Sequence, residues 1–238
     1  MELLKCYTYD NKIRLGRDYD GGYIVLDGFE YNILISCSIF SDYSFEQDFL
    51  KKYPNIKTYI YNEQKSNKLI SNKNLIYKNV FFKKHVNNKL SETENDLHQI
   101  IKNNKNIFLK IDVKGEEFEL LSNLNHDLLS NISQMIIVFY YPFKINRFNV
   151  FKKINQTHYL IHLHPNNNYS TIKINNITVP EVFECTYINK NLISKPELNN
   201  RNIPCDLDQK NCKNKEDIHL SRYPYSFWRI HYFDDREI

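Results

Sequence analysis

Short, almost wholly apolar segments alternate along this chain with helical patterns of about ten residues. Residues 33–35, 107–113 and 134–141 are apolar runs of strand length, rich in β-branched side chains. Apolar residues recur at helical spacing over 44–53 and 92–102. This alternation predicts βαβ units and therefore an α/β fold, with a mainly parallel sheet covered by helices on both faces and an antiparallel edge.

The remaining predicted elements fit one domain. Further strands are expected at 24–26, 56–61, 74–82 and 159–164, and further helices at 116–124 and 147–154. Residues 171–179 and 181–187 predict a closing hairpin, and Trp228, Ile230 and Tyr232 alternate as a final strand. We expect a single domain over 1–238, in which 1–30 is an N-terminal lead-in and 189–238 is an extension packed on the same domain.

Composition excludes several classes of protein. The 238 residues carry 32 basic and 28 acidic side chains, and the basic ones are spread along the chain, which does not indicate a nucleic-acid binder. No apolar run reaches the roughly 18–20 residues of a membrane helix, and no signal peptide is evident, so a soluble, cytoplasmic protein is expected. Ala is absent and Gly is rare. This bias suggests an AT-rich genome, such as that of a parasite, a protist or a large DNA virus, whose factory would lie in the host cytoplasm.

Five cysteines occur without any CxxC pair. Cys205 and Cys212 could form a disulfide, or could bind a metal together with His219. The preferred interpretation is that all five are reduced thiols of a cytosolic protein.

The segment LKIDVKGEEFEL, residues 109–120, is the most informative for chemistry. Asp112 ends an apolar strand and is followed by Gly115 and a helical pattern. In a doubly wound sheet this position lies at the edge where ligands bind. The alternative is that Asp112 only caps the helix or stabilises the turn.

The same segment resembles the LKxDxEGxEx(V/L)L motif of FkbM-like methyltransferases, which use S-adenosylmethionine (SAM). Five other segments are similar to that family in the same order: 14–27, 35–49, 161–167, 179–188 and 203–211. The resemblance implies a Rossmann-like methyltransferase sandwich. It also implies methyl transfer from SAM to a hydroxyl, often on a sugar or another small metabolite.

The resemblance also indicates which residues would contact SAM. Gly21, Gly22 and Tyr23 would lie near the cofactor, although two glycines also suit a tight turn. The cofactor loop would be Ser36-Cys37-Ser38, and the ribose would be bound by Asn62 or Glu63 after the next strand.

Four positions depart from the family pattern. Ser36-Cys37-Ser38 contains no Gly, so a side chain could obstruct the cofactor. The ribose-binding acid is displaced from Asn62 to Glu63. Lys114 replaces a Glu, and Tyr140-Tyr141 stands where the family has Glu and His. Changes concentrated at one sheet edge suggest that a site was remodelled or lost.

Methyl transfer to a hydroxyl needs a group that removes the proton, which is worth roughly 10²–10⁴ in rate. Asp112 is the candidate base, with His164 and Lys114 as further catalytic candidates; Lys114 could instead pair with Asp112 and weaken it as a base. His162 and His164 share one strand face, which is alternatively only a polar face. No metal site is assigned, but Asp112 and Glu184 could hold a divalent metal, or Glu184 could be the buried ion-pair partner of a Lys or Arg.

Two functions follow from these observations. The first is a SAM-dependent O-methyltransferase acting on a carbohydrate or small-molecule hydroxyl. The alternative is a catalytically silent methyltransferase-like scaffold that has lost SAM binding. The expected partner is a small-molecule or glycan acceptor, not nucleic acid, and the aromatic tail could support a homo-oligomer.

Overall fold

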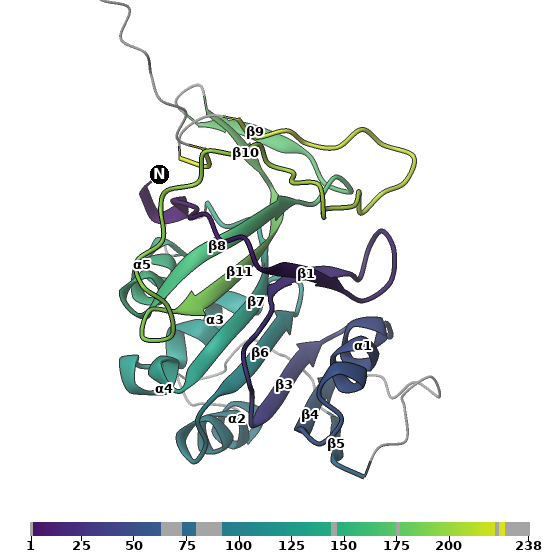
Figure 1. Ribbon diagram of the computed structural model, residues 1–238, viewed down its shortest axis with the longest axis vertical. Helices are drawn as coiled ribbons and strands as arrows, with labels where there is room; N and C mark the ends of the chain where they lie inside the picture. The colour runs from purple at the N-terminus through teal and green to yellow at the C-terminus, as the bar shows by residue number, and fades with distance from the viewer. Residues whose placement is uncertain are drawn as a thin grey trace, which may run out of the picture.

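The computed structural model describes residues 2–62, 73–79, 92–143, 147–174, 177–221 and 224–226. Its centre is a seven-stranded sheet in the order β5-β4-β3-β6-β7-β11-β8 (Figure 1). The strands are β3 (Ile33–Ser38), β4 (Lys57–Asn62), β5 (Leu75–Asn79), β6 (Ile107–Asp112), β7 (Ile132–Tyr140), β8 (His158–Pro165) and β11 (Val182–Asn189). The predicted α/β class with a mostly parallel sheet is confirmed.

The antiparallel strand does not lie where the sequence suggests. β11 runs antiparallel to both of its neighbours, β7 and β8, so it lies one position in from the edge. β8 forms the edge and runs in the direction of β7. The predicted closing hairpin is therefore wrong, because β9 (Thr171–Ile174) pairs with β10 (Ile177–Pro180) in a separate two-stranded sheet. This small hairpin turns the chain back, so that β11 can enter between β7 and β8.

The order of the strands creates a switch point in the middle of the sheet. From β3 the chain builds outward through β4 to β5, and then returns to place β6 on the other side of β3. β3 is parallel to β4 and to β6, and Ser38 is the register partner of Asp112. The carboxyl ends of β3 and β6 therefore meet at the position where open α/β sheets bind ligands.

Two apolar clusters lie against the sheet and are covered differently. The helices are α1 (Ser44–Lys52), α2 (Glu92–Lys102), α3 (Glu117–Asn123), α4 (His126–Ser130) and α5 (Phe148–Thr157). Side chains of α2 to α5 pack in one cluster with Ile35, Leu109 and Ile137. Those of α1 join the other, with Leu34 and Phe108 and with the antiparallel hairpin of β1 (Lys12–Leu15) and β2 (Tyr23–Leu26). Within the described residues, α1 and this hairpin cover their face beside the switch point.

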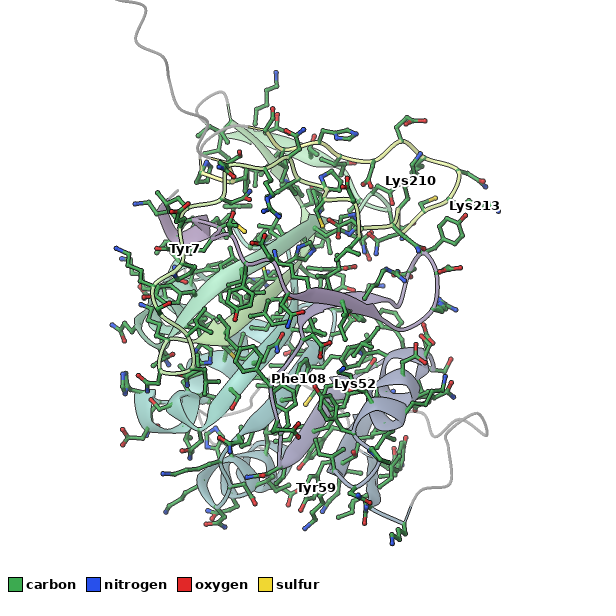
Figure 2. All side chains as sticks on the ribbon, in the orientation of Figure 1. Tyr7, Lys52, Tyr59, Phe108, Lys210 and Lys213 are labelled. Atoms are coloured by element: carbon green, nitrogen blue, oxygen red, sulfur yellow. The ribbon has the colours of Figure 1, made fainter. Side chains whose placement is uncertain are left out.

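The segment after β11 carries no helix or strand of the sheet in its described part, and it packs against the start of the chain. The backbone N–H of Asn199 donates to the carbonyl of Cys6 at 2.8 Å, and Arg201 pairs with Asp10. Lys213 lies on the outer loop of this segment (Figure 2). Its ammonium group is 5.4 Å from the ring centre of Tyr19. The strand predicted around Trp228 lies outside the described residues. No helix in the described part of the chain is long and apolar enough to cross a membrane.

Candidate functional site

A cavity of about 480 Å³ opens at the carboxyl ends of β3, β6 and β7. Its wall is rich in acids, cations and aromatic rings: Asp20, Asp42, Asp112 and Glu184; Arg17, Lys110 and Lys114; Tyr23, Phe40, Tyr43, Tyr140 and Tyr169. The volume falls within the roughly 300–1,000 Å³ of small-molecule sites, and the position is the switch point of the sheet.

Asp112 is held by two phenols at the base of this cavity. Tyr23 donates its hydroxyl hydrogen bond to Oδ2 at 3.1 Å, and Tyr140 donates to Oδ1 at 3.0 Å. Burial raises the pKa of Asp112 to about 6, although the positive charge of Lys110 and the two phenol hydrogen bonds lower it. The carboxylate is thus poised to exchange a proton near neutral pH, with only 8% of the residue exposed.

Lys110 lies two residues before Asp112 on the same face of β6 and brings a buried positive charge to the cavity wall. Its Nζ lies 2.9 Å from Oε1 of Glu46 on α1, and this oxygen also accepts a 2.5 Å hydrogen bond from Ser36. Burial lowers the pKa of Lys110, but attraction to Glu46 and Asp112 outweighs burial, so the pKa is raised. The ammonium group therefore stays charged. Its partner Glu46 is a residue that the sequence alone did not single out.

The loop without glycine leaves the cavity open. The hydroxyl of Ser36 points to Glu46, and the thiol of Cys37 is fully buried in the apolar cluster on the other face of the sheet. Only Ser38 lines the cavity, and its Oγ accepts a hydrogen bond from the backbone N–H of Phe40 at 3.1 Å. No side chain of Ser36 or Cys37 lines the crevice.

Of the two adjacent glycines, Gly21 is required by its left-handed backbone conformation, whereas Gly22 only leaves room for a neighbouring side chain. Gly21 lines the cavity with φ of +95°, and a Cβ there would overlap the carboxylate of Asp42. A Cβ on Gly22 would overlap the guanidinium of Arg14. Gly22 does not line the cavity, whereas Tyr23 does, so the structure places two of these three predicted residues at the site.

The end of β4 contributes less than expected. The carboxamide of Asn62 is fully buried, and its Nδ2 donates to the backbone carbonyl of Phe40 at 2.6 Å. Asn62 therefore stabilises the loop after β3 and does not line the cavity. Glu63, the other residue predicted to bind ribose, lies outside the described residues.

Lys114 and His164 occupy different surroundings. Lys114 is exposed at the cavity wall, and no ion pair joins it to Asp112 in the described part of the chain. His164 is 3% exposed and does not line the cavity. Its Nδ1 lies 3.7 Å from Oε2 of Glu184, and its Nε2 lies 3.5 Å from Oδ2 of Asp217, both ion-pair distances.

His164 serves the site through Glu184. Although burial disfavours a charged imidazole, Asp217 and Glu184 together raise the pKa of His164 to about 10, so the ring is an imidazolium at neutral pH. Glu184 lines the cavity and accepts a 2.7 Å hydrogen bond from Asn211. This arrangement makes Glu184 a buried ion-pair partner, but the cation is His164 and not the Lys or Arg that the sequence suggested. Asn211 was missed as a site residue, although it ends the family-like segment 203–211.

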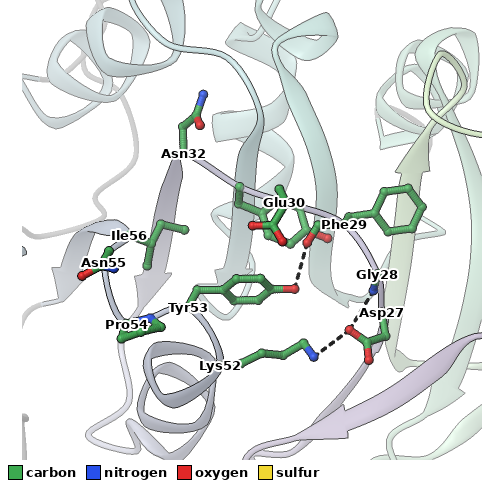
Figure 3. A pocket seen from close by; sticks show the side chains of 11 residues that line it. Asp27, Gly28, Phe29, Glu30, Asn32, Lys52, Tyr53, Pro54, Asn55 and Ile56 are labelled. Atoms are coloured by element: carbon green, nitrogen blue, oxygen red, sulfur yellow. Dashed lines mark hydrogen bonds and ion pairs between the residues drawn. The ribbon is translucent and has the colours of Figure 1, made fainter.

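A second opening, of about 520 Å³, lies between the end of α1 and the segment after β2 (Figure 3). It is closed on one side by the ion pair of Lys52 with Asp27 at 2.8 Å, and by the hydrogen bond from Tyr53 to the carbonyl of Phe29. The opening lies beside the amino ends of β3 and β4, opposite to the ligand edge of the sheet. We therefore assign the functional site to the cavity around Asp112.

Comparison with known proteins found no family model and no curated protein that matches the chain.

Proposed function

We propose that this chain is a SAM-dependent O-methyltransferase that acts on a carbohydrate or small-molecule hydroxyl. The observation that carries the proposal is a carboxylate with pKa near 6, held by two phenols, in the wall of a 480 Å³ cavity at the switch point. The FkbM-like order of sequence segments points to the same chemistry. The proposal also includes a more specific fold, a Rossmann-like methyltransferase sandwich with helices on both faces of the sheet.

The residues of the cavity fit SAM in size and chemistry. SAM carries a sulfonium cation, and carboxylates and aromatic faces attract cations. The rings of Tyr140 and Tyr169 would face the sulfonium region, and Phe40 offers a ring on which adenine can stack. The glycine-free loop does not close the cavity, since Ser38 is the only residue of Ser36-Cys37-Ser38 that lines it.

SAM, when bound, supplies an electrophilic methyl group. Asp112 accepts the proton of the acceptor hydroxyl, because its carboxylate is ionised above about pH 6. Tyr23 and Tyr140 fix the orientation of this carboxylate through their hydrogen bonds. Lys110 stabilises the ionised form, while its own charge is balanced by Glu46. Asn166 and Asn168 line the same cavity and can hydrogen-bond a polyhydroxylated acceptor.

Calorimetry with SAM and with its demethylated product tests the cofactor part of the proposal. We expect a Kd of about 1–100 μM, or about −8 to −5.5 kcal/mol. Phe40→Ala should weaken binding by roughly tenfold, because stacking of a base on an aromatic ring is worth about 1–3 kcal/mol. Leu192→Ala, which removes a similarly exposed apolar side chain beyond the end of β11 opposite to Glu184, is the control.

The alternative is a scaffold with a methyltransferase-like fold and no SAM binding. It is favoured by the end of β4, where the amide of Asn62 faces a backbone carbonyl and does not line the cavity. An absence of heat with either ligand at millimolar concentration, in protein shown to be folded by circular dichroism, would support the scaffold and exclude the enzyme.

A further inference from the structure

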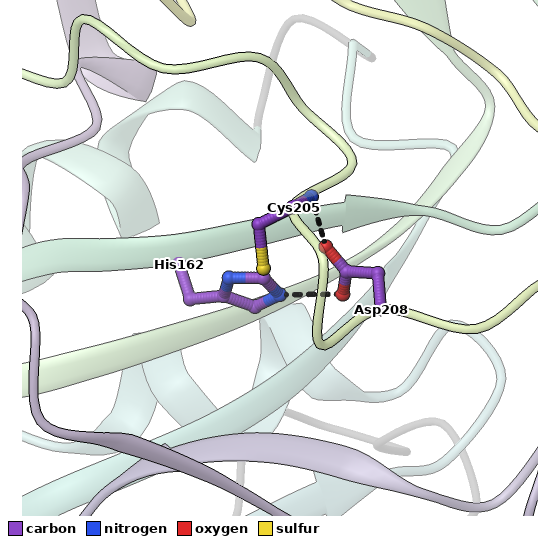
Figure 4. Close-up of side chains that lie close together, drawn as sticks. All are labelled: His162, Cys205 and Asp208. Carbon is purple, nitrogen blue, oxygen red and sulfur yellow. Dashed lines mark hydrogen bonds and ion pairs between the residues drawn. The ribbon is translucent and has the colours of Figure 1, made fainter.

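A second group of reactive side chains lies outside the cavity of Asp112. His162 on β8 meets Cys205 and Asp208 from the C-terminal segment, and one ligand atom from each lies within 4.8 Å of the others (Figure 4). The sequence suggested a metal partnership of Cys205 with Cys212 and His219. In the structure, Cys205 instead lies beside Asp208, three residues later in the same segment, and beside His162, which is 43 residues earlier on β8.

The turn that carries Cys205 and Asp208 is fixed before any ligand binds. The backbone N–H of Cys205 donates to Oδ2 of Asp208 at 2.8 Å, and the backbone N–H of Asp208 donates to the carbonyl of Cys205 at 3.0 Å. The other carboxylate oxygen, Oδ1, lies 2.9 Å from Nε2 of His162. The thiol and one carboxylate oxygen are thus both presented to the imidazole, as Figure 4 shows.

The separations suit a tetrahedral ion. Zinc bonds of about 2.0–2.3 Å place neighbouring N, O and S ligands roughly 3.3–3.6 Å apart. The 2.9 Å contact of His162 with Asp208 is slightly shorter than this, and the widest separation in the group is at most 4.8 Å. The three ligand atoms therefore already lie near the separations that a bound ion would impose.

The immediate surroundings supply access and balance the charge. A cavity of about 400 Å³ is lined by His162 and Cys205 and also by Cys6 and Lys12. This cavity can admit a water molecule as fourth ligand, or Cys6 can approach. A thiolate and a carboxylate together carry two negative charges, which match a divalent ion. Lys12 opposes a cation, but its Nζ donates to the backbone carbonyl of Ile161 at 2.6 Å.

We propose that His162, Cys205 and Asp208 bind a divalent transition-metal ion of the zinc class. Imidazole, thiolate and carboxylate are the ligands that zinc takes in proteins. Binding replaces the hydrogen bond between His162 and Asp208 by two metal bonds. The proton on Nε2 of His162 moves through solvent to Nδ1, so that the ring binds as neutral imidazole, and the proton of the Cys205 thiol is released to solvent. The ion would fasten the C-terminal segment to the edge strand β8. It would thereby hold Asn211 against Glu184, so its role is structural and separate from methyl transfer.

Titration of the full chain with Co²⁺, as a spectroscopic substitute for Zn²⁺, tests this proposal. We expect one equivalent to give a sulfur-to-cobalt charge-transfer band in the near ultraviolet and the visible bands of tetrahedral cobalt. Zn²⁺ should abolish both. Cys205→Ser should remove the charge-transfer band and weaken Co²⁺ binding by roughly 100-fold or more, since even loss of an outer-shell partner costs 10–100-fold.

Cys212→Ser is the matched control, because Cys212 is a half-buried free thiol seven residues along the same segment. It should leave the bands unchanged. Asp208→Asn should weaken binding while the charge-transfer band persists at high Co²⁺ concentration. The proposal is overturned if the wild-type chain gives no charge-transfer band, or if the band survives in Cys205→Ser. Neither result bears on SAM binding, which calorimetry measures separately.

Discussion

At the scale of single residues, Asp112 shows how opposing effects set one pKa. Burial alone would raise the pKa of this carboxyl further above its usual value. Lys110 and the phenols of Tyr140 and Tyr23 favour the charged form, and the balance is a pKa of about 6. A general base works best when its pKa lies near the working pH, so the surroundings of Asp112 suit proton removal.

Removal of one phenol should move the pH dependence of catalysis. Tyr140→Phe deletes a hydrogen bond to the ionised carboxylate, which raises the pKa of Asp112. The acid limb of kcat/KM, expected near pH 6, should therefore shift to higher pH by roughly one unit or more. Tyr141→Phe, at an exposed neighbouring position, should leave the limb in place. An unshifted limb in Tyr140→Phe would mean that another group titrates.

Removal of the Asp112 carboxylate should lower turnover without weakening SAM binding. Asp112→Asn keeps the shape of the side chain but cannot accept a proton, so methyl transfer should fall by roughly 10²–10⁴. The affinity for SAM, measured by calorimetry, should stay nearly unchanged. Asp127→Asn, the same change on an almost fully exposed side chain of α4, serves as the control. Equal turnover in the two variants would remove Asp112 from the role of base.

At the scale of elements, the turn from β6 into α3 is joined to the end of β7 by Glu117. One carboxylate oxygen of Glu117 accepts a hydrogen bond from the backbone N–H of Gly115 at 2.6 Å, and the other accepts one from the backbone N–H of Tyr140 at 2.7 Å. Lys114 and Gly115 both have positive φ, of 48° and 115°, so the turn is sharp. Glu117 thus satisfies two backbone donors, and it holds Asp112 and Tyr140 at their mutual distance.

Glu117→Gln should destabilise the fold. An amide cannot accept from both N–H groups, because its NH₂ end would face one of them. We expect a loss of about 1–3 kcal/mol in the free energy of unfolding, measured by urea denaturation. Glu116→Gln, at a partly exposed position on the same turn, should change it little. Equal midpoints for the two variants would show that the buried carboxylate is not needed there.

Individual helices and strands could largely be predicted from the sequence, whereas the order of the strands in the sheet could not. The helix predicted at 92–102 has those bounds in α2, and the strand at 107–113 ends one residue earlier in β6. α4 was missed, because five residues are too short for a periodic pattern. The place of β11 depends on pairing with two strands distant in sequence, for which a local pattern holds no information.

At the scale of the whole molecule, buried contacts between histidines and carboxylates join the C-terminal segment to the sheet. His162 bonds Asp208, and His164 lies between Glu184 and Asp217. The sequence placed both histidines on one face of a strand. It also identified Asp112, because the motif around this residue is contiguous. It could not identify Asp208, Asp217 or Asn211, since these meet β8 and β11 only after the chain has folded back.

Because His164 is charged in the folded chain, the free energy of unfolding should fall as the pH rises into the alkaline range. The pKa of His164 is raised to about 10 in the folded chain, against 6.5 for an ordinary histidine. Its stabilising contribution is therefore fully present below about pH 6.5 and is lost as the pH rises through 10. Urea unfolding between pH 6 and 10 should show this decline in wild type.

His164→Gln should lower the free energy of unfolding at pH 6 and flatten its decline at higher pH. His126→Gln, at an exposed position on α4, should keep the wild-type profile. A wild-type slope that persists in His164→Gln would place the titration on another group.

The contact of Asn211 with Glu184 and Asp20 has a consequence for synthesis of the protein. A ribosome adds residue 20 almost two hundred steps before residue 211, so the emerging polypeptide cannot form this amide contact for nearly the whole of translation. Premature termination before residue 211 would release a product that keeps the residues lining the cavity but lacks the amide that holds Glu184. The carboxylate of Glu184 therefore gains this hydrogen bond only after all the strands of the sheet have been synthesised.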